Sequence, residues 1–268
     1  MASKARRSAG SEPQASGQWH ALLERSDPVA GVPGPGRWLA AQFEATSLFS
    51  LKVSSATSSV GKTQVVPTPY AIKMALVDAA FRVGLAESEC DSLLRRLAGV
   101  EVRIAPASAA VVTHTFLKVR QESRDGDPLR PYGSTIAYRE VAHLGDALVW
   151  AFDLCGADET TAWRLVELLP HICYIGKRGS FVRFVRFWRL SELDAGFTQP
   201  LVRQGTWSLP ARAHIVPLDD FGPDADLETL SSFTNKRPKR DKHRRFVETI
   251  VPVGIVNTGP GFTEYRRE

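Results

Sequence analysis

Cysteine is scarce in this sequence, and its scarcity excludes two kinds of framework. Only Cys90, Cys155 and Cys173 occur in 268 residues. Their odd number and wide spacing fit neither a network of disulfide bonds nor a paired Cys-x-x-Cys metal site. Such sparse use of cysteine is typical of a protein in a reducing compartment.

Long apolar runs are missing as well. No stretch approaches the roughly 20 consecutive apolar residues that cross a bilayer, and the N-terminus lacks the apolar segment of a signal peptide. We therefore expect a cytoplasmic protein with no membrane partner.

Familiar catalytic motifs are absent too. The sequence has neither a Gly-x-Ser-x-Gly motif nor a phosphate-binding loop. Its histidines show no metal-ligand spacing: His20, His114, His143, His171, His214 and His243. We expect no cofactor and no metal, assign no catalytic residue and favour a role other than catalysis. RNA cleavage without a metal stays open, because a histidine can take the proton of a 2′-hydroxyl near neutral pH.

The composition that remains is that of a folded, basic protein. Hydrophobic residues make up 43% of the chain, and 34 lysines and arginines against 29 acidic residues give a net charge of +5. Basic residues gather in 177–189 and 236–245, and acidic residues in 219–228. This segregation predicts one positive surface and a polyanionic partner.

The order of the expected elements predicts an α+β fold. Residues 1–36, rich in Ser, Ala, Gly and Pro, are expected to form a disordered arm. Thr68 is a candidate cap for a helix that starts at Pro69, and Asp158 is a candidate cap for a later helix. The expected strands are 42–53, 100–104, 111–121, 135–141 and 147–154, and the expected helices are 69–83, 87–98 and 158–169. This is the outline of a ferredoxin-like, RNA-recognition-type domain, in which antiparallel strands pack against helices.

Two strands of this series are expected to form a long hairpin. The strands at 111–121 and 135–141 are separated by the polar stretch RDGDPLRPYGS. Arg124, Arg130 and Tyr132 would lie at its tip.

A charged turn is the most unusual local feature. Lys177 and Arg178 lie between Gly176 and Gly179, followed by Ser180, whereas a hairpin tip needs only a pair such as Asn-Gly. Arg183, Arg186 and Arg189 then recur among aromatic residues in FVRFVRFWRL. Arginine interleaved with aromatics suits single-stranded nucleic acid. The alternative is an ordinary solvated turn followed by a strand whose aromatics belong to the core.

A second basic run, KRPKRDKHRR at 236–245, contains no apolar residue. It is expected to be a solvated loop, and such a loop can fold onto a phosphate backbone and add salt-dependent affinity.

Several segments, in their order, resemble the Cas-five family of CRISPR-associated RAMP proteins. They are VVPTPYAIKMALVDAAF, FLKV, STIAYREVAHLGDALVWAFDL and YIGKRGSFVRF, within about residues 42–190. In that family the Pro-Thr-Pro segment leads into the first helix, a Tyr-Arg-Glu strand follows a protruding thumb hairpin, and a glycine-bounded basic turn closes the domain. The chain departs from the pattern at Lys73 and Met74, near which many members have glycine.

The resemblance implies a domain organisation. It places a ferredoxin-like RAMP domain at 37–190 with a thumb hairpin at about 111–141. Residues 191–268 would then be a β-rich C-terminal extension that carries the basic loop 236–245.

The resemblance also implies a function and a set of partners. The chain would be a subunit of a type I-like CRISPR surveillance (Cascade) complex that binds the 5′ handle of the guide RNA. It would cap the backbone RAMP subunits and contact a large subunit, with target DNA as an open further partner. The residues expected to bind RNA are Lys118, Arg120, Tyr138, Arg139, Gly176, Lys177, Arg178, Gly179, Ser180, Arg183, Arg186, Lys236, Arg237, Lys239 and Arg240.

Two other functions remain in competition with this one. The first is a metal-independent endoribonuclease that processes precursor CRISPR RNA, as one subtype of the family does. The second is a basic scaffold protein unrelated to the family.

Overall fold

The computed structural model describes residues 32, 36–53, 60–122, 129, 131–201, 209–231 and 233–267. Of the predicted arm, only Val32 and Gly36 are among them, and Val32 is buried in the main core. Arg124 and Arg130, expected at the hairpin tip, lie outside the described residues.

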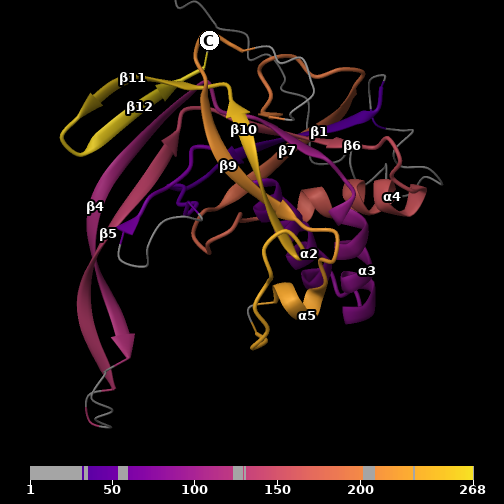
Figure 1. Ribbon diagram of the computed structural model, residues 1–268, viewed down its shortest axis with the longest axis horizontal. Coiled ribbons are helices and arrows are strands. Elements are labelled where there is room, and N and C mark those ends of the chain that lie inside the picture. The colour runs from indigo at the N-terminus through magenta and orange to yellow at the C-terminus, as the bar shows by residue number, and fades with distance from the viewer. Residues whose placement is uncertain are drawn as a thin grey trace, which may run out of the picture.

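A four-stranded antiparallel sheet forms the centre of the molecule (Figure 1). Its strands lie in the order β3-β6-β1-β7. They are β1 (Trp38–Ala45), β3 (Val102–Ala105), β6 (Leu148–Asp153) and β7 (Val182–Leu190). The two strands in the middle, β1 and β6, pair with each other, so segments more than 100 residues apart in the sequence lie side by side.

The first strand starts earlier than predicted, and its first half, 38–41, is buried on both faces. We expected a half-buried strand over 42–53, but β1 covers Trp38–Ala45. Leu39, Ala41 and Phe43 belong to the main core, whereas Trp38 packs in a second cluster on the opposite face that includes Phe197. Because both faces are covered, the strand has no alternating pattern to mark where it begins.

Helices cover one face of this sheet (Figure 1). They are α2 (Pro69–Arg82), α3 (Glu87–Ala98) and α4 (Glu159–Leu168), followed by the short helix η1 (Leu169–His171). The helix starts agree with the prediction: the side chain of Thr68 accepts a hydrogen bond from Ala71 N, and that of Asp158 accepts one from Thr161 N. Pro69 occupies the first turn of α2, where its missing N–H costs no hydrogen bond.

A long hairpin extends away from the body of the molecule (Figure 1). Strands β4 (Ala109–Glu122) and β5 (Tyr132–Leu144) pair from Ala110 and Leu144 to Glu122 and Tyr132. They belong to a five-stranded sheet in the order β11-β12-β4-β5-β2. Its other strands are β2 (Val60–Gly61), β11 (Gly254–Gly259) and β12 (Phe262–Arg266).

The remaining C-terminal residues pack against the first helix. Strands β8 (Gln199–Pro200), β9 (His214–Phe221) and β10 (Arg244–Val251) form a third sheet in the order β8-β10-β9, and α5 (Leu227–Leu230) follows β9. Phe221 at the end of β9 packs edge-on against the ring of Tyr70 on α2, with their centroids 5.4 Å apart. This contact brings the C-terminal segment to the N-terminal end of α2. None of the described helices is both long enough and apolar enough to cross a membrane.

Candidate nucleic-acid interface

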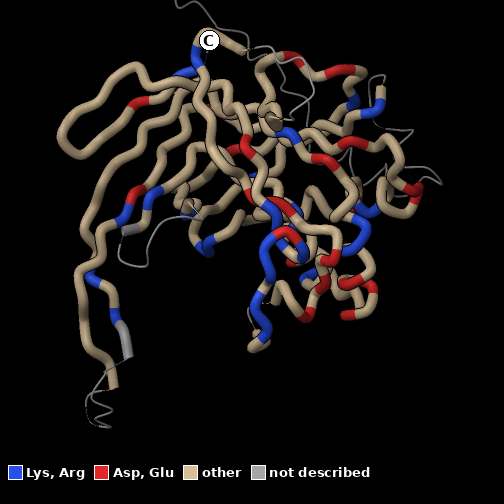
Figure 2. Tube along the Cα trace, in the orientation of Figure 1, with Lys and Arg blue, Asp and Glu red and all other residues tan. Residues whose placement is uncertain are grey.

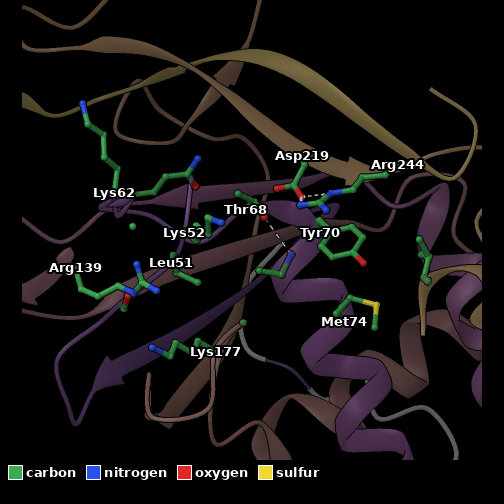
Figure 3. Close-up of a pocket in the computed structure, with 16 residues that line it drawn as sticks. Leu51, Lys52, Lys62, Thr68, Tyr70, Met74, Arg139, Lys177, Asp219 and Arg244 are labelled. Atoms are coloured by element: carbon green, nitrogen blue, oxygen red, sulfur yellow. Dashed lines mark hydrogen bonds and ion pairs between the residues drawn. The ribbon is translucent and has the colours of Figure 1, made fainter. Parts of the chain in front are cut away.

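A cleft of about 570 Å³ opens where α2, β5, the turn at 176–180 and the β9–β10 pair meet (Figure 3). Its lining combines cations with apolar side chains. The residues are Ser50, Leu51, Lys52, Gly61, Lys62, Gln64, Thr68, Tyr70, Ala71, Met74, Arg139, Gly176, Lys177, Asp219, Leu230 and Arg244.

The cations of the cleft come from separate parts of the chain. Lys52 and Lys62 precede α2 in the chain, Arg139 lies on β5, Lys177 in the charged turn and Arg244 on β10. Figure 3 shows Lys52, Lys62, Arg139 and Lys177 around one side of the cleft and Arg244 on the other. Five cations against one carboxylate, that of Asp219, give the lining a positive charge, which suits an anion.

Glycine allows a close approach at two points of this lining. A Cβ on Gly61 would lie 2.8 Å from Cδ of Arg139, and a Cβ on Gly176 would lie 2.8 Å from Cδ2 of Leu51. Gly176 also has a φ of +66°, which an L side chain rarely adopts. Small residues therefore let Arg139 and the charged turn approach the segment that carries Leu51 and Lys52.

The charged turn is fixed by hydrogen bonds to residues 47–50. Ser47 Oγ donates to the carbonyl of Gly179 at 2.6 Å, and Ser180 Oγ accepts from Ser50 N at 3.1 Å. Ser180 is only 2% exposed. Its hydroxyl therefore helps to hold the turn in place, and RNA binding by Ser180 stays a prediction.

The two cations of the turn lie in different surroundings. Lys177 lines the cleft, and Arg178 is not among the lining residues. Arg178 lies near Tyr174 instead, whose hydroxyl donates to Asp78 Oδ1 at 2.9 Å. Burial and the bond to Asp78 raise the pKa of Tyr174, and Arg178 opposes that shift. Lys177 and Arg178 thus form a natural pair for comparison, one inside the cleft and one outside.

The wall opposite the turn is apolar and aromatic. Tyr70 and Met74 project from the first turns of α2, and Leu230 is a further apolar residue of the lining. Leu51, by contrast, lies against the turn at Gly176. Burial raises the pKa of the Tyr70 hydroxyl, while Arg244 lowers it and Asp219 raises it further. A neutral phenol beside apolar side chains suits a planar group such as a nucleobase.

One buried acceptor in the lining lacks a donor. Gln64 is 8% exposed, and its Oε1 has no hydrogen-bond partner within the described part of the chain. A buried amide oxygen without a partner costs free energy, so a donor from a bound molecule would stabilise it.

The C-terminal basic run is only partly a loop. Residues 241–243 form a turn, and Arg244 and Arg245 begin β10. The acidic stretch neutralises part of the run: Arg244 pairs with Asp219, Arg245 with Asp220, and Lys236 with Glu228. Figure 2 shows basic and acidic residues side by side in this region. The predicted separation of the charges is therefore corrected here, and Lys236, Arg237, Lys239 and Arg240 lie outside the cleft lining.

Arg183 and Arg186 of β7 lie on another face of the molecule. The register of β7 against β1 shifts at Gln42 and Phe43, so Arg183 opposes Glu44 and Arg186 opposes Gln42. This irregularity puts the two arginines on one face despite their three-residue spacing. That face is turned away from the helices, because Phe43, between their partners, belongs to the main core. Arg183 is paired with Glu44, and Arg186 donates to Gln42 Oε1 at 3.0 Å.

The long hairpin carries the remaining predicted residues. Tyr138, Phe116 and His114 form a ladder of rings on one face, with centroid distances of 5.3 Å from Tyr138 to His114 and 5.2 Å to Phe116. Lys118 and Arg120 continue this face towards the tip. Phe116 is 72% exposed and Ile136, opposite Lys118, is 74% exposed. Such exposure of large apolar side chains is typical of a contact surface.

The predicted site thus divides between several surfaces. Gly176, Lys177 and Arg139 meet in the cleft. Arg183 and Arg186 of β7 and the other predicted residues of the hairpin, Lys118, Arg120 and Tyr138, are not among its lining residues. The prediction missed Lys52, Lys62, Tyr70, Asp219 and Arg244. Only Tyr70 gave a local signal, as an aromatic residue directly after the Pro-Thr-Pro segment.

The fold and the cleft define a mixed α/β protein with antiparallel sheets and a cation-lined groove. The chain matches no family model. It is similar to the CRISPR-associated protein Cas5 of Archaeoglobus fulgidus, with 18% identity over 212 residues that cover 78% of this chain and 91% of the relative. This similarity confirms the resemblance to the Cas-five family that the sequence motifs predicted.

The chain is also similar to solved structures. A crystal structure of a CRISPR protein from Archaeoglobus fulgidus has 12% identity, a TM-score of 0.42, and coverage of 86% of this chain and 92% of that one. A chain of a type III-B Cmr-β complex bound to cognate target RNA has 10% identity, a TM-score of 0.39, and coverage of 56% and 59%. A Cas6 product complex has 15% identity, a TM-score of 0.30, and coverage of 64% and 55%.

Proposed function

We propose that this chain is a non-catalytic subunit of a type I-like CRISPR surveillance complex and that its cleft binds the 5′ handle of the guide RNA. The observation that carries the proposal is the meeting of Lys52, Lys62, Arg139, Lys177 and Arg244 beside an apolar wall. Single-stranded RNA needs both parts, because cations neutralise its phosphates while an aromatic or apolar wall takes its unstacked bases.

The topology supports the same proposal. Strands and helices follow each other as β1, α2 and α3, β3, β6, α4 and β7, and the sheet order is β3-β6-β1-β7. This order matches what we expect of the split arrangement of a ferredoxin-like domain, and so supports the proposal. Under this proposal the β4–β5 hairpin is the thumb, and its exposed Phe116 and Ile136 contact a backbone subunit.

The test compares two neighbouring residues of the charged turn. We expect Lys177→Ala to weaken binding of a labelled guide RNA and to lower the slope of log affinity against log salt by about 0.7, the contribution of one contact to single-stranded phosphate. Adding Arg139→Ala should lower the slope by about 1.4 in total. Arg178→Ala removes the same charge outside the cleft and is the matched control. Equal effects of Lys177→Ala and Arg178→Ala would contradict binding in the cleft.

A second candidate, RNA cleavage without a metal, is motivated by His114. Its Nε2 lies 3.8 Å from Oε1 of Glu140, and its ring packs against Tyr138. A histidine next to a carboxylate on a basic hairpin can act as a general base. Incubation with precursor RNA in EDTA separates the two functions: cleavage that disappears in His114→Ala would establish the nuclease, and intact RNA supports the non-catalytic subunit.

A further inference from the structure

Arg244 is a cation of the cleft whose side chain is held by contacts with several other side chains. Its Nε donates to Asp219 Oδ2 at 2.6 Å, and one of its terminal nitrogens also contacts that oxygen. Its side chain is 35% exposed, whereas that of Asp219 is 5% exposed. The carboxylate therefore lies behind the guanidinium, which faces the cleft.

Two aromatic rings add to this support. Cζ of Arg244 lies 4.5 Å from the centroid of the Tyr70 ring and 5.6 Å from that of Phe246. Stacking on a ring fixes the plane of a guanidinium, and the bond to Asp219 fixes its rotation within that plane. The donors on the edge away from Asp219 are left for a further acceptor.

The carboxylate of Asp220, next to Asp219 in the sequence, has different partners. Asp220 Oδ1 lies 2.6 Å from Nζ of the fully buried Lys73, and its Oδ2 accepts from Arg245 at 2.9 Å. Asp220 thus neutralises a lysine in the core, and Asp219 interacts with Arg244 at the surface of the cleft. Consecutive residues of a strand point to opposite sides, which explains this division.

We propose that Asp219 is a positioning residue that orients Arg244 to bind a phosphate of the RNA. The inference rests on the function proposed above and adds a role for an acidic residue in an otherwise basic site. Holding the guanidinium in its binding orientation before RNA arrives removes part of the entropy cost of ordering it.

The direction in which Asp219→Asn changes the affinity for RNA separates a positioning role from a purely electrostatic one. Asp219→Asn removes a negative charge, so a purely electrostatic cleft would bind RNA more tightly. Positioning predicts the opposite: affinity for a labelled guide RNA should fall by about threefold to tenfold, the ordering cost of one long side chain. In an Arg244→Ala background, the same substitution should cause no loss, because the residue it positions is gone.

Three controls accompany this comparison. Arg244→Lys keeps the charge without the planar fork and should not restore the affinity lost in Arg244→Ala. Arg245→Ala removes the adjacent arginine, which is paired with Asp220 and is not among the lining residues, and should have a smaller effect. Thermal melting of each variant identifies any that fail to fold, and Asp219→Glu then serves as a second, charge-conserving probe that should bind more tightly than Asp219→Asn.

The outcomes distinguish this inference from the proposed function. Unchanged or tighter binding in Asp219→Asn, together with weaker binding in Lys177→Ala, would overturn the positioning role and leave the RNA cleft standing. If Lys177→Ala, Arg139→Ala and Arg244→Ala all bind RNA as the wild type does, the proposal that the cleft binds RNA is wrong.

Discussion

Nζ of Lys73 lies 2.6 Å from Oδ1 of Asp220, and no part of the lysine side chain is exposed to solvent. Lys73 lies on the first helix, near the point where many Cas-five proteins have glycine, and Asp220 lies near the C-terminal end of β9. The departure from the family pattern is therefore explained by packing: the lysine joins α2 to the C-terminal segment. The same segment delivers Arg244 to the cleft.

Asp220→Asn should destabilise the fold strongly. The substitution leaves the buried ammonium group of Lys73 without a counter-charge, and breaking a buried pair in this way costs about 3 to 5 kcal/mol. Urea unfolding followed by circular dichroism measures the loss. Asp219→Asn is the matched control and should cost less, because its partner Arg244 is one-third exposed and can be hydrated.

The double variant Asp220→Asn with Lys73→Met should recover part of this loss, since it removes the unpaired charge as well. If Asp220→Asn alone is as stable as Asp219→Asn, the buried pair does not hold the segment to α2.

The stability of the protein should depend on Lys73 at alkaline pH. Burial lowers the pKa of Lys73 below its ordinary value of 10.5, although Asp220 opposes the shift. Between the lowered pKa and 10.5 the unfolded chain binds more protons than the folded one, so stability rises with pH across that window. The contribution of this titration to the free energy of unfolding is complete above pH 10.5. It is lost as the pH falls through the pKa that Lys73 has in the folded protein.

Lys73→Met removes this titration without affecting the tyrosines. The free energy of unfolding of the wild type, minus that of Lys73→Met, should therefore increase as the pH approaches 10.5. Denaturant titrations at several alkaline pH values measure it. A difference that stays flat or falls with pH would show that burial does not dominate the environment of Lys73.

The sequence predicted those parts of the fold that depend on local chemistry. Thr68 and Asp158 cap their helices as expected, because a cap is a contact between residues three apart. The start of β1 was missed, because it depends on Phe197 covering a second face from a distant part of the chain. The β-bulge that aligns Arg183 with Arg186 was missed for the same reason, since register is set by pairing with β1.

The candidate site was predicted in two places, the charged turn between glycines and the Tyr-Arg-Glu segment that contains Arg139. Lys177 follows Gly176 and was recognised, whereas Arg244 was counted with a solvated loop. Its role depends on Asp219 and on Tyr70, which lies 174 positions earlier and contacts it only in the folded protein. No local pattern carries that information.

Gly179→Ala should destabilise the protein even without RNA. Gly179 has a φ of +105°, and no atom lies within 4 Å of the position that a Cβ would take. The cost is therefore one of backbone conformation, about 1 to 2 kcal/mol. Gly133→Ala is the control, because Gly133 also has open space around it but lacks a positive φ. Equal stability of the two variants, measured by thermal unfolding, would contradict the backbone argument.

Shortening the β4–β5 hairpin should separate folding from assembly. Glu122 and Tyr132 pair directly, so residues 123–131 can be replaced by Asn-Gly without changing the strand register. The core of the molecule lies far from this end of the hairpin (Figure 1), and the melting temperature should stay within about 2 °C of the wild type. If the hairpin is a thumb, co-purification with the backbone subunits should fall sharply, because its strands carry large exposed apolar side chains that a neighbouring subunit would cover.

A second variant of the β4–β5 hairpin tests its exposed apolar side chains rather than its tip. Phe116→Ser with Ile136→Thr keeps the strands intact and removes the two most exposed apolar side chains of the paired region. It should impair assembly as the shortened hairpin does, while Val256→Thr on β11 changes an exposed apolar residue elsewhere and should not. Normal assembly of both hairpin variants would mean that the hairpin contacts no subunit, and the surface for the backbone would have to be sought on another face.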